Sequence, residues 1–247
     1  REVESYGFFL ILGITGNSSN NEKKYISEFI SRKVDGVIWV PQLTYVNDIE
    51  HMKKLDEYGI PYLFLAAYYE QSSAPFVMCN LKKGSYLMTQ YLIERDIHNI
   101  VMLIGDRRVD ETYISGYKMA LEEAGLVYSE SNVYESTYHF DDVQKLAMEI
   151  LKERPEAIMT NSDFTACAVL QAARIKGLSI PRDLSVCGYD DVIYATINQI
   201  PLTTVSQPIE RMCKLAVNNL MNLLQYGIVP DSVILEPSLI IRDTVKR

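Results

Sequence analysis

The sequence predicts an α/β fold in which parallel β-sheets are flanked by helices. Short apolar runs alternate with longer amphipathic segments along the 247 residues, as expected for strands alternating with helices. Runs such as Val37–Val40 are apolar at every position, which is typical of strands covered on both faces. Apolar residues make up 48% of the chain, and its length exceeds the roughly 100–200 residues of one ordinary domain. We therefore predict one large domain or two modest ones.

The individual elements follow from the periodicity. The apolar runs predict strands at Phe8–Leu12, Gly36–Val40, Tyr62–Ala66, Phe76–Cys79, Ile100–Ile104, Ala157–Thr160, Leu184–Cys187, Leu202–Val205 and Leu239–Ile241. The amphipathic segments predict helices at about 21–33, 47–58, 82–95, 112–124, 141–153, 164–176 and 209–225. Residues 1–6 resemble the last turns of a helix that ends at Gly7. No Gly/Ser-rich or Pro-rich linker divides the chain, so two lobes are expected to be joined by short crossovers.

Composition argues against several classes of function. The chain has 24 Lys and Arg against 32 Asp and Glu, a net charge of −8, and no basic run, which disfavours a nucleic-acid-binding surface. Its apolar stretches are far shorter than the roughly 18–20 residues of a membrane-spanning helix. The four cysteines are widely spaced and form no CxxC pair, which predicts buried, reduced thiols in a cytoplasmic protein.

Sequence motifs for catalysis are missing. The sequence contains no GxGxxG, GxxxxGK[ST], HExxH or GxSxG pattern. His51 is expected to be solvated on a polar helix and His98 to lie in a loop, whereas His139 lies in an aromatic loop and is a candidate ligand contact. We therefore predict no enzyme, no cofactor and no metal site, although carboxylates can also act in catalysis.

Polar residues at the ends of three predicted strands form the candidate ligand site. In a parallel sheet, ligands bind where the carboxyl ends of strands meet. Asp190 and Asp191 follow one strand, and they are equally compatible with a ligand contact and with a cap of the next helix. For Asp163 the helix cap is the stronger interpretation. A third strand end carries Arg107 and Arg108, whose donors suit carboxylates, phosphates or hydroxyl groups.

Aromatic residues in the predicted loops add to this site. Tyr68, Tyr69, Tyr138 and Phe140 offer flat faces, which together with paired donors and acceptors suit a sugar. The same set of groups suits a nucleobase.

Two segments then indicate a family. Pro181–Asp191, with the sequence PRDLSVCGYDD, and Pro201–Pro208, with the sequence PLTTVSQP, together closely resemble the effector-binding domain of LacI-family (LacI/GalR) transcription regulators. Shorter matches in the family's order cover essentially the whole chain, at residues 33–38, 59–61, 115–121, 162–166 and 239–242.

The resemblance implies a periplasmic-binding-protein-like fold of type I. It has two Rossmann-like lobes joined by three crossover strands, with the effector in the cleft between them. One lobe is expected at 1–80 plus 207–230 and the other at 81–206 plus 231–247. The family begins this domain with one more strand and helix, after a helix-turn-helix and a hinge helix. We expect those parts, including the first strand of the domain, to be missing from this chain.

The resemblance also assigns site residues. Asp190 matches the family's effector-binding aspartate, and Ser162 lies in its strand-end contact. Phe140 falls near the family's stacking aromatic residue, and Gln207 lies at the third crossover and faces the cleft.

Two positions depart from the family pattern. Tyr113 stands where the family commonly has an arginine, and Asn80-Leu81 stands where it commonly has Asp-Asn. Losing the arginine removes a bidentate clamp, which Arg107 or Arg108 is expected to replace.

The functional hypothesis is the effector-sensing and dimerisation core of a cytoplasmic repressor. A small molecule, most simply a sugar or sugar derivative, is expected to bind the closed lobes better than the open ones and so to change affinity for operator DNA. DNA would be bound through an N-terminal domain outside this chain, and a homodimer follows from the resemblance alone. Helix 209–225 is expected to be a core helix. The alternatives are a periplasmic or lipid-anchored sugar-binding protein of an ABC transporter, and an enzyme acting on nucleosides or sugars.

Overall fold

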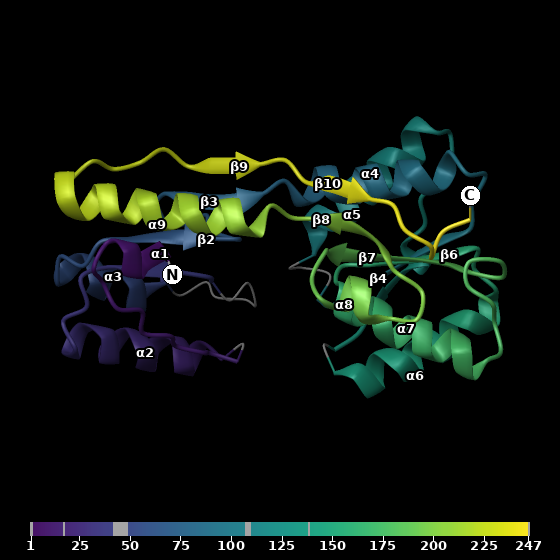
Figure 1. The fold of residues 1–247 in the computed structure, drawn as a ribbon, viewed down its shortest axis with the longest axis horizontal. Coiled ribbons are helices and arrows are strands. Elements are labelled where there is room, and N and C mark those ends of the chain that lie inside the picture. The colour runs from purple at the N-terminus through teal and green to yellow at the C-terminus, as the bar shows by residue number, and fades with distance from the viewer. Residues whose placement is uncertain (1, 17, 42–48, 107–109, 138, 247) are drawn as a thin grey trace. The chain divides into compact units, whose positions relative to one another are not determined.

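The chain folds into two compact α/β units (Figure 1). The computed structural model describes residues 2–16, 18–41, 49–106, 110–137 and 139–246. Unit 1 comprises Arg1–Cys79 and Pro208–Leu235, and unit 2 comprises Asn80–Gln207 and Glu236–Arg247. The polypeptide therefore passes three times from one unit to the other.

Unit 1 is built on a four-stranded parallel sheet with the order β1-β2-β3-β9. Its elements are α1 (Glu2–Ser5), α2 (Ser19–Ser31), β1 (Val37–Trp39), α3 (Glu50–Glu57), β2 (Tyr62–Leu65), β3 (Phe76–Cys79), α9 (Ile209–Tyr226) and β9 (Val233–Leu235). On one face, α2 and α3 pack over Trp39 and Phe64, while α9 covers the other face. Helices thus cover both faces of the sheet, as its apolar strands predict, although Ile234 of the edge strand β9 is 55% exposed.

The predicted strand at Phe8–Leu12 is wrong. These residues form no strand, and Phe9 is 95% exposed. A cavity of about 520 Å³ lies between this segment and the start of the edge strand β1, with Leu220 and Leu224 of α9 in its lining. A strand exists only where a neighbouring backbone completes its hydrogen bonds, and among the described residues this apolar run has no such neighbour.

Unit 2 is built on a six-stranded sheet with the order β10-β8-β7-β6-β4-β5. Its elements are β4 (Ile100–Ile104), β5 (Val133–Glu135), β6 (Ala157–Thr160), β7 (Ser185–Asp190), β8 (Thr203–Ser206), β10 (Ser238–Ile240), the helices α4 (Leu81–Ile93), α5 (Glu111–Glu123), α6 (Phe140–Ile150), α7 (Asp163–Ile175) and α8 (Tyr194–Ile197), and the short 3₁₀ turns Glu130–Asn132 and Leu151–Glu153. All neighbours are parallel except β10, which runs antiparallel to β8.

Strand β4 shows how the two faces of this sheet are covered. Ile100, Met102 and Ile104 pack with α4 and α5, whereas Val101 and Leu103 pack with α6 and α7. All five are buried because successive side chains of a strand point to opposite faces and each face has its own helix pair. The continuous apolar run is therefore a strand between two helical layers.

Helices α4 and α5 approach each other through a glycine. A Cβ atom on Gly116 would lie 2.1 Å from the backbone oxygen of Lys82 and 2.9 Å from the backbone nitrogen of Tyr86. Gly84 of α4 makes a similar approach to the sheet, where a Cβ would lie 2.0 Å from the hydroxyl of Tyr189. Glycine at these positions brings the helices closer to their neighbours than any other residue would allow.

Several boundaries differ from the sequence prediction. Strands β5 and β9 and helix α8 were not predicted, and β7 continues to Asp190 instead of ending at Cys187. Residues 231–235, predicted to belong to the second lobe, lie in unit 1 because Val233–Leu235 pairs with β3. Short strands with few apolar positions give no clear period, so their pairing partners decide their place.

Helix α9 is a core helix, as predicted, and only part of its surface is buried. Met212, Ala216 and Leu220 are buried, whereas Ile209 is 42% exposed. Cys213 is also exposed, so the prediction of buried thiols fails there; Cys79 and Cys187 are buried, and all four cysteines are free.

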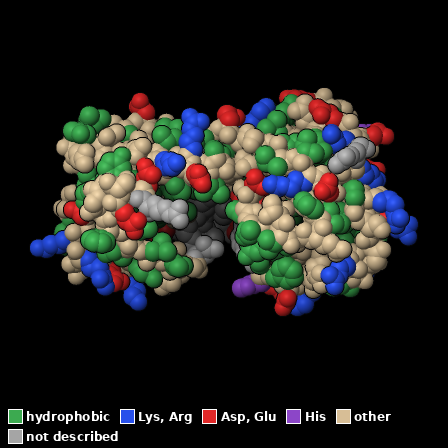
Figure 2. Space-filling model, in the orientation of Figure 1, with side chains coloured by type: hydrophobic (Ala, Val, Ile, Leu, Met, Phe, Trp, Pro, Cys, Tyr) green, Lys and Arg blue, Asp and Glu red, His purple; other side chains and the backbone are tan. Residues whose placement is uncertain are grey.

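No helix in the described ranges combines the length and apolarity needed to span a bilayer. On the face shown in Figure 2, Lys and Arg side chains are scattered among acidic and apolar ones and form no large patch.

Candidate functional site

The candidate site lies at the carboxyl ends of neighbouring parallel strands in unit 2. Strands β6, β7 and β8 lie side by side, and each ends in polar residues. These are Asn161–Asp163 after β6, Asp190–Asp191 at the end of β7, and Ser206–Gln207 at the end of β8. The sheet therefore gathers residues that are far apart in the sequence at one edge, as parallel sheets commonly do at ligand sites.

Asp190 and Asp191 adopt an unusual backbone conformation. Their φ angles are +100° and +57°, a region that residues other than glycine rarely occupy. Each such residue costs about 1–3 kcal/mol and persists only where its surroundings hold it in place. The helix-cap alternative for this pair is wrong, because α8 begins only at Tyr194 and has no side-chain cap. Strain of this kind is often found at functional sites.

Gln207 holds the Asp190 carboxylate. Its Nε2 donates to Asp190 Oδ1 over 2.7 Å, which joins the ends of β7 and β8. Burial raises the pKa of Asp190 above its usual range, and the bond from Gln207 partly opposes this. Two of the predicted site residues are therefore in direct contact.

Asp191 is held by an arginine that sequence analysis did not select. Arg242 Nη2 lies 2.6 Å from Asp191 Oδ1, and the two side chains are only 20% and 21% exposed. The same guanidinium donates from Nη1 to the backbone oxygen of Leu202 over 2.9 Å. This ion pair connects the segment after β10 to the loop after β7.

Asp163 lies fully buried behind this loop, and its predicted role as a helix cap is wrong. The N-cap of α7 is Ser162, whose Oγ accepts a bond of 3.1 Å from the backbone nitrogen of Thr165. Asp163 accepts instead from the hydroxyl of Thr204 over 2.5 Å and from the backbone nitrogen of Val192 over 2.8 Å. Burial is the main cause that raises its pKa to about 6, and the charges of Asp190 and Asp191 add to the rise.

We expect Asp163→Asn to stabilise the protein at pH 7.5 by about 1–3 kcal/mol. The native state binds a proton on Asp163 more tightly than the unfolded chain does. The contribution of this group to the stability of the folded protein is therefore lost as pH rises from about 4 to about 6. The asparagine amide removes the buried charge, and it still accepts from Val192 and donates to Thr204.

Urea unfolding of the wild type and the variant at pH 4, 5, 6 and 7.5 measures this effect, with the exposed Asp142→Asn as the control. An equal pH slope in the wild type and in Asp163→Asn would contradict the assignment.

A further buried carboxylate, that of Asp110, follows β4 at the same carboxyl end of the sheet, and sequence analysis missed it. Asp110 Oδ2 accepts from the backbone nitrogen of Gly105 over 2.9 Å and from Asn161 Nδ2 over 2.8 Å. Burial raises the pKa of Asp110 to about 6, against the effect of these bonds. The only sequence signal was its position just after an apolar strand and before a helix.

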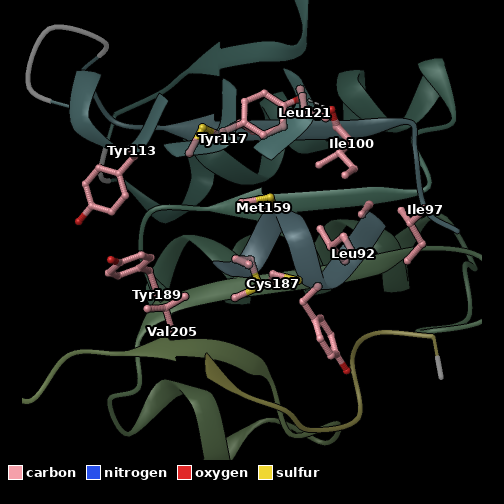
Figure 3. Close-up of a cluster of buried hydrophobic side chains, with 14 of the residues drawn as sticks. Leu92, Ile97, Ile100, Tyr113, Tyr117, Leu121, Met159, Cys187, Tyr189 and Val205 are labelled. Atoms are coloured by element: carbon pink, nitrogen blue, oxygen red, sulfur yellow. Dashed lines mark hydrogen bonds between the residues drawn. The ribbon is translucent and has the colours of Figure 1, made fainter. Parts of the chain in front are cut away.

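Tyr113, at the position of the family's arginine, is a core residue. It is buried on α5, and its ring packs edge-to-face against Tyr189 with 4.9 Å between centroids (Figure 3). Tyr189 immediately precedes Asp190, so Tyr113 packs against the end of β7 next to the site.

Five other residues are predicted to contact the ligand: Arg107, Arg108, Tyr138, His139 and Phe140. Phe140 packs against Phe164 of α7, with ring centroids 5.8 Å apart, and is partly buried. His139 is the N-cap residue of α6 and makes no side-chain cap bond. Arg107, Arg108 and Tyr138 lie outside the described residues. Their predicted role as ligand contacts stays a prediction.

A second polar cluster lies in unit 1 and overturns the expectation for His51. Its ring is 4% exposed, and its Nε2 lies 3.3 Å from Glu22 Oε2. The Glu22 carboxylate also accepts from Trp39 Nε1 over 3.0 Å and from the hydroxyl of Tyr69 over 3.2 Å. The polar neighbours of His51 on its own helix suggested solvation, but the packing of α3 against α2 buries the ring.

The described side chains at this edge offer carboxylates, an amide and hydroxyls, which recognise hydroxyl-rich or NH-bearing ligands. Within the described ranges, no group of three or more His, Cys, Asp or Glu side chains is arranged to hold a metal ion.

Comparison with known proteins identifies the family. The model of the periplasmic binding protein-like domain family matches residues 89–245. The HTH-type transcriptional repressor PurR of Vibrio atlanticus (strain LGP32) is 34% identical over 256 residues, covering 99% of this chain and 75% of that protein. The chain belongs to the LacI family of transcriptional regulators. The resemblance and the fold class given by the sequence are thereby confirmed.

Other members extend the comparison. The LacI-family chain spans 63% of the length of the HTH-type transcriptional regulator DegA of Bacillus subtilis (strain 168), with 30% identity over 213 residues and 85% of this chain covered. A solved structure of the transcriptional regulator CelR in complex with cellobiose is 26% identical and superposes with a TM-score of 0.82, covering 92% of this chain and 71% of that chain.

Proposed function

We propose that this LacI-family chain is the effector-sensing part of a transcription regulator and that a small molecule binds at the carboxyl edge of the six-stranded sheet in unit 2. The observation that carries the proposal is the strained, half-buried Asp190 at the end of β7, with its carboxylate oriented by Gln207. Asp190 Oδ1 accepts the bond from Gln207, and we propose that Oδ2 accepts a hydrogen bond from the ligand.

The ligand class is proposed from the chemistry of this edge. Asp190 accepts hydrogen bonds, and Ser162 and Gln207 add polar groups on the neighbouring strands. Such sets of acceptors and donors bind the hydroxyl groups of a sugar or sugar derivative. The complex of the related CelR with cellobiose supports this class. Phe140, Arg107 and Arg108 remain proposed contacts, whereas Tyr113 is proposed to act through Tyr189.

The regulatory role is proposed from the family. The relatives PurR and DegA are named as HTH-type regulators, so we propose that the full protein binds operator DNA through a helix-turn-helix outside this chain. We propose a homodimer in the cytoplasm with no catalytic activity, and a ligand that changes operator affinity by binding one conformation better than another. The two lobes are proposed to correspond to units 1 and 2 of the structure.

The test is a thermal-shift screen of cellobiose, D-ribose, sugar phosphates, nucleobases and amino acids, followed by calorimetry of each hit. A compound that binds only the native state raises Tm by mass action. We expect Asp190→Ala to weaken the hit by about 10- to 100-fold, because a hydrogen bond to a charged acceptor is lost.

The control is Glu149→Ala, which removes an exposed carboxylate of α6 and should leave the affinity unchanged. A hit whose affinity is equal in the wild type and in Asp190→Ala binds elsewhere and would overturn the proposed site. Turnover of the hit by the wild type would favour an enzyme instead. Binding of the hit with no effect on operator affinity of the full regulator would favour the transporter-associated alternative.

A further inference from the structure

Side chains from other elements hold the loop after β7 in its strained conformation. Asp190 and Asp191 both have positive φ, and the next residue, Val192, donates its backbone N–H to Asp163 Oδ2 over 2.8 Å. A short loop in such a conformation relaxes unless side chains from other elements fix it. The residues that fix it therefore decide where the Asp190 carboxylate lies.

Hydrogen bonds fix Arg242 at its backbone and at both terminal nitrogens of its guanidinium. Its backbone nitrogen donates to Thr203 Oγ1 over 3.0 Å, and its Nη1 donates to the backbone oxygen of Leu202 over 2.9 Å. Its Nη2 then meets Asp191 Oδ1 at 2.6 Å. The planar guanidinium thus spans from the start of β8 to the loop after β7, which a single ammonium group does not reproduce.

The burial of this pair separates it from an ordinary surface ion pair. Arg242 and Asp191 are 20% and 21% exposed, whereas Arg182 in the Arg182–Asp183 pair of the same unit is 77% exposed. Exposed pairs hold their side chains weakly, while a largely buried pair with further hydrogen bonds fixes both partners. Arg182 therefore provides a matched control.

We propose that Arg242 is a positioning residue for the effector site: through Asp191 it locks the strained loop that presents the Asp190 carboxylate. The inference rests on the proposed function for its ligand and on geometry alone for the loop. It ties the segment after β10, which sequence analysis had assigned no role in the site, to the residue that is expected to contact the effector. Arg242 itself does not touch the ligand.

The first experiment needs no ligand. Amide hydrogen exchange by NMR compares the wild type with Arg242→Met, which keeps much of the side-chain length and removes the donors. We expect exchange at the Val192 amide to rise at least tenfold, while the Thr165 amide, bonded to Ser162, is unchanged. Arg242→Lys should restore part of the protection, and Asp191→Asn should add nothing to Arg242→Met. Arg182→Met should change neither amide.

The second experiment uses cellobiose as the probe, measured by calorimetry. If the wild type binds it, Arg242→Met should weaken the affinity about tenfold or more, and Arg182→Met should not. Unchanged Val192 exchange in Arg242→Met would overturn the proposal, as would an equal acceleration of all amides of unit 2, which marks a purely structural role. Absence of cellobiose binding by the wild type bears on the proposed ligand only, because the exchange experiment still decides the role of Arg242.

Discussion

Replacing Gly116 with alanine should destabilise the protein by about 3 kcal/mol or more, one of the largest losses expected from a single methyl group. The new Cβ would lie 2.1 Å from the backbone oxygen of Lys82 in α4. Backbone atoms of a packed helix cannot rotate away as the end of a side chain can, so α5 has to move away from α4. That movement opens the cluster in which Tyr117 and Leu121 of α5 are buried.

Urea unfolding measures this loss, and Gly125→Ala at the end of the same helix is the control. Gly125 has a φ of +72° and no atom within 4 Å of the added Cβ, so only the backbone conformation is penalised, by about 1 kcal/mol. A loss for Gly116→Ala no larger than that for Gly125→Ala would show that the helices separate at little cost.

Glu22→Ala should destabilise unit 1 by about 3–5 kcal/mol. The carboxylate is 2% exposed and accepts hydrogen bonds from Trp39, His51 and Tyr69. Removing it leaves these donors buried without their acceptor. A buried donor without an acceptor destabilises the folded state by the full free energy of its desolvation. The three donors come from β1, α3 and the loop before β3, so the loss loosens the face of the sheet that α2 covers.

The matched control is Glu28→Ala on the same helix. Glu28 pairs with Arg32 one turn away and is 40% exposed, so its removal should cost about 0.3–0.5 kcal/mol. Fluorescence of Trp39, the single tryptophan, follows the unfolding of unit 1 directly. If Glu22→Ala and Glu28→Ala unfold at the same urea concentration, the buried network contributes little to stability.

The sequence predicts the layers of the fold better than its edges. The apolar run at β4 has no polar alternation, and the structure covers both of its faces with helices. The run at Phe8–Leu12 is also apolar at every position but forms no strand, because strand formation depends on a neighbouring backbone that composition does not reveal. His51 shows the same limit for burial, since its polar sequence neighbours predicted solvation.

The candidate site was predicted only where a motif carried it. Asp190, Gln207 and Ser162 lie in segments that match the family, and the structure places them on adjacent strands. Arg242 and Asp110 were missed as site residues, because the side chains that tie them to the site, Asp191 and Asn161, each lie 51 residues away. Periodicity and local motifs carry no information at such separations, and single-position departures such as Tyr113 suggest a lost function where the structure shows a core contact.

The sequence by itself determined the α/β class, most helices and strands, and the family, and it singled out Asp190 as a candidate for the ligand site. These follow from local periodicity and from motifs that are contiguous along the chain. Only the tertiary structure decided which strands pair, which carboxylates are buried with raised pKa values, and that Arg242 and Gln207 hold the strained end of β7. Pairing, burial and strain depend on groups brought together by the sheet from distant parts of the chain, and their energies exist only once those groups are in contact.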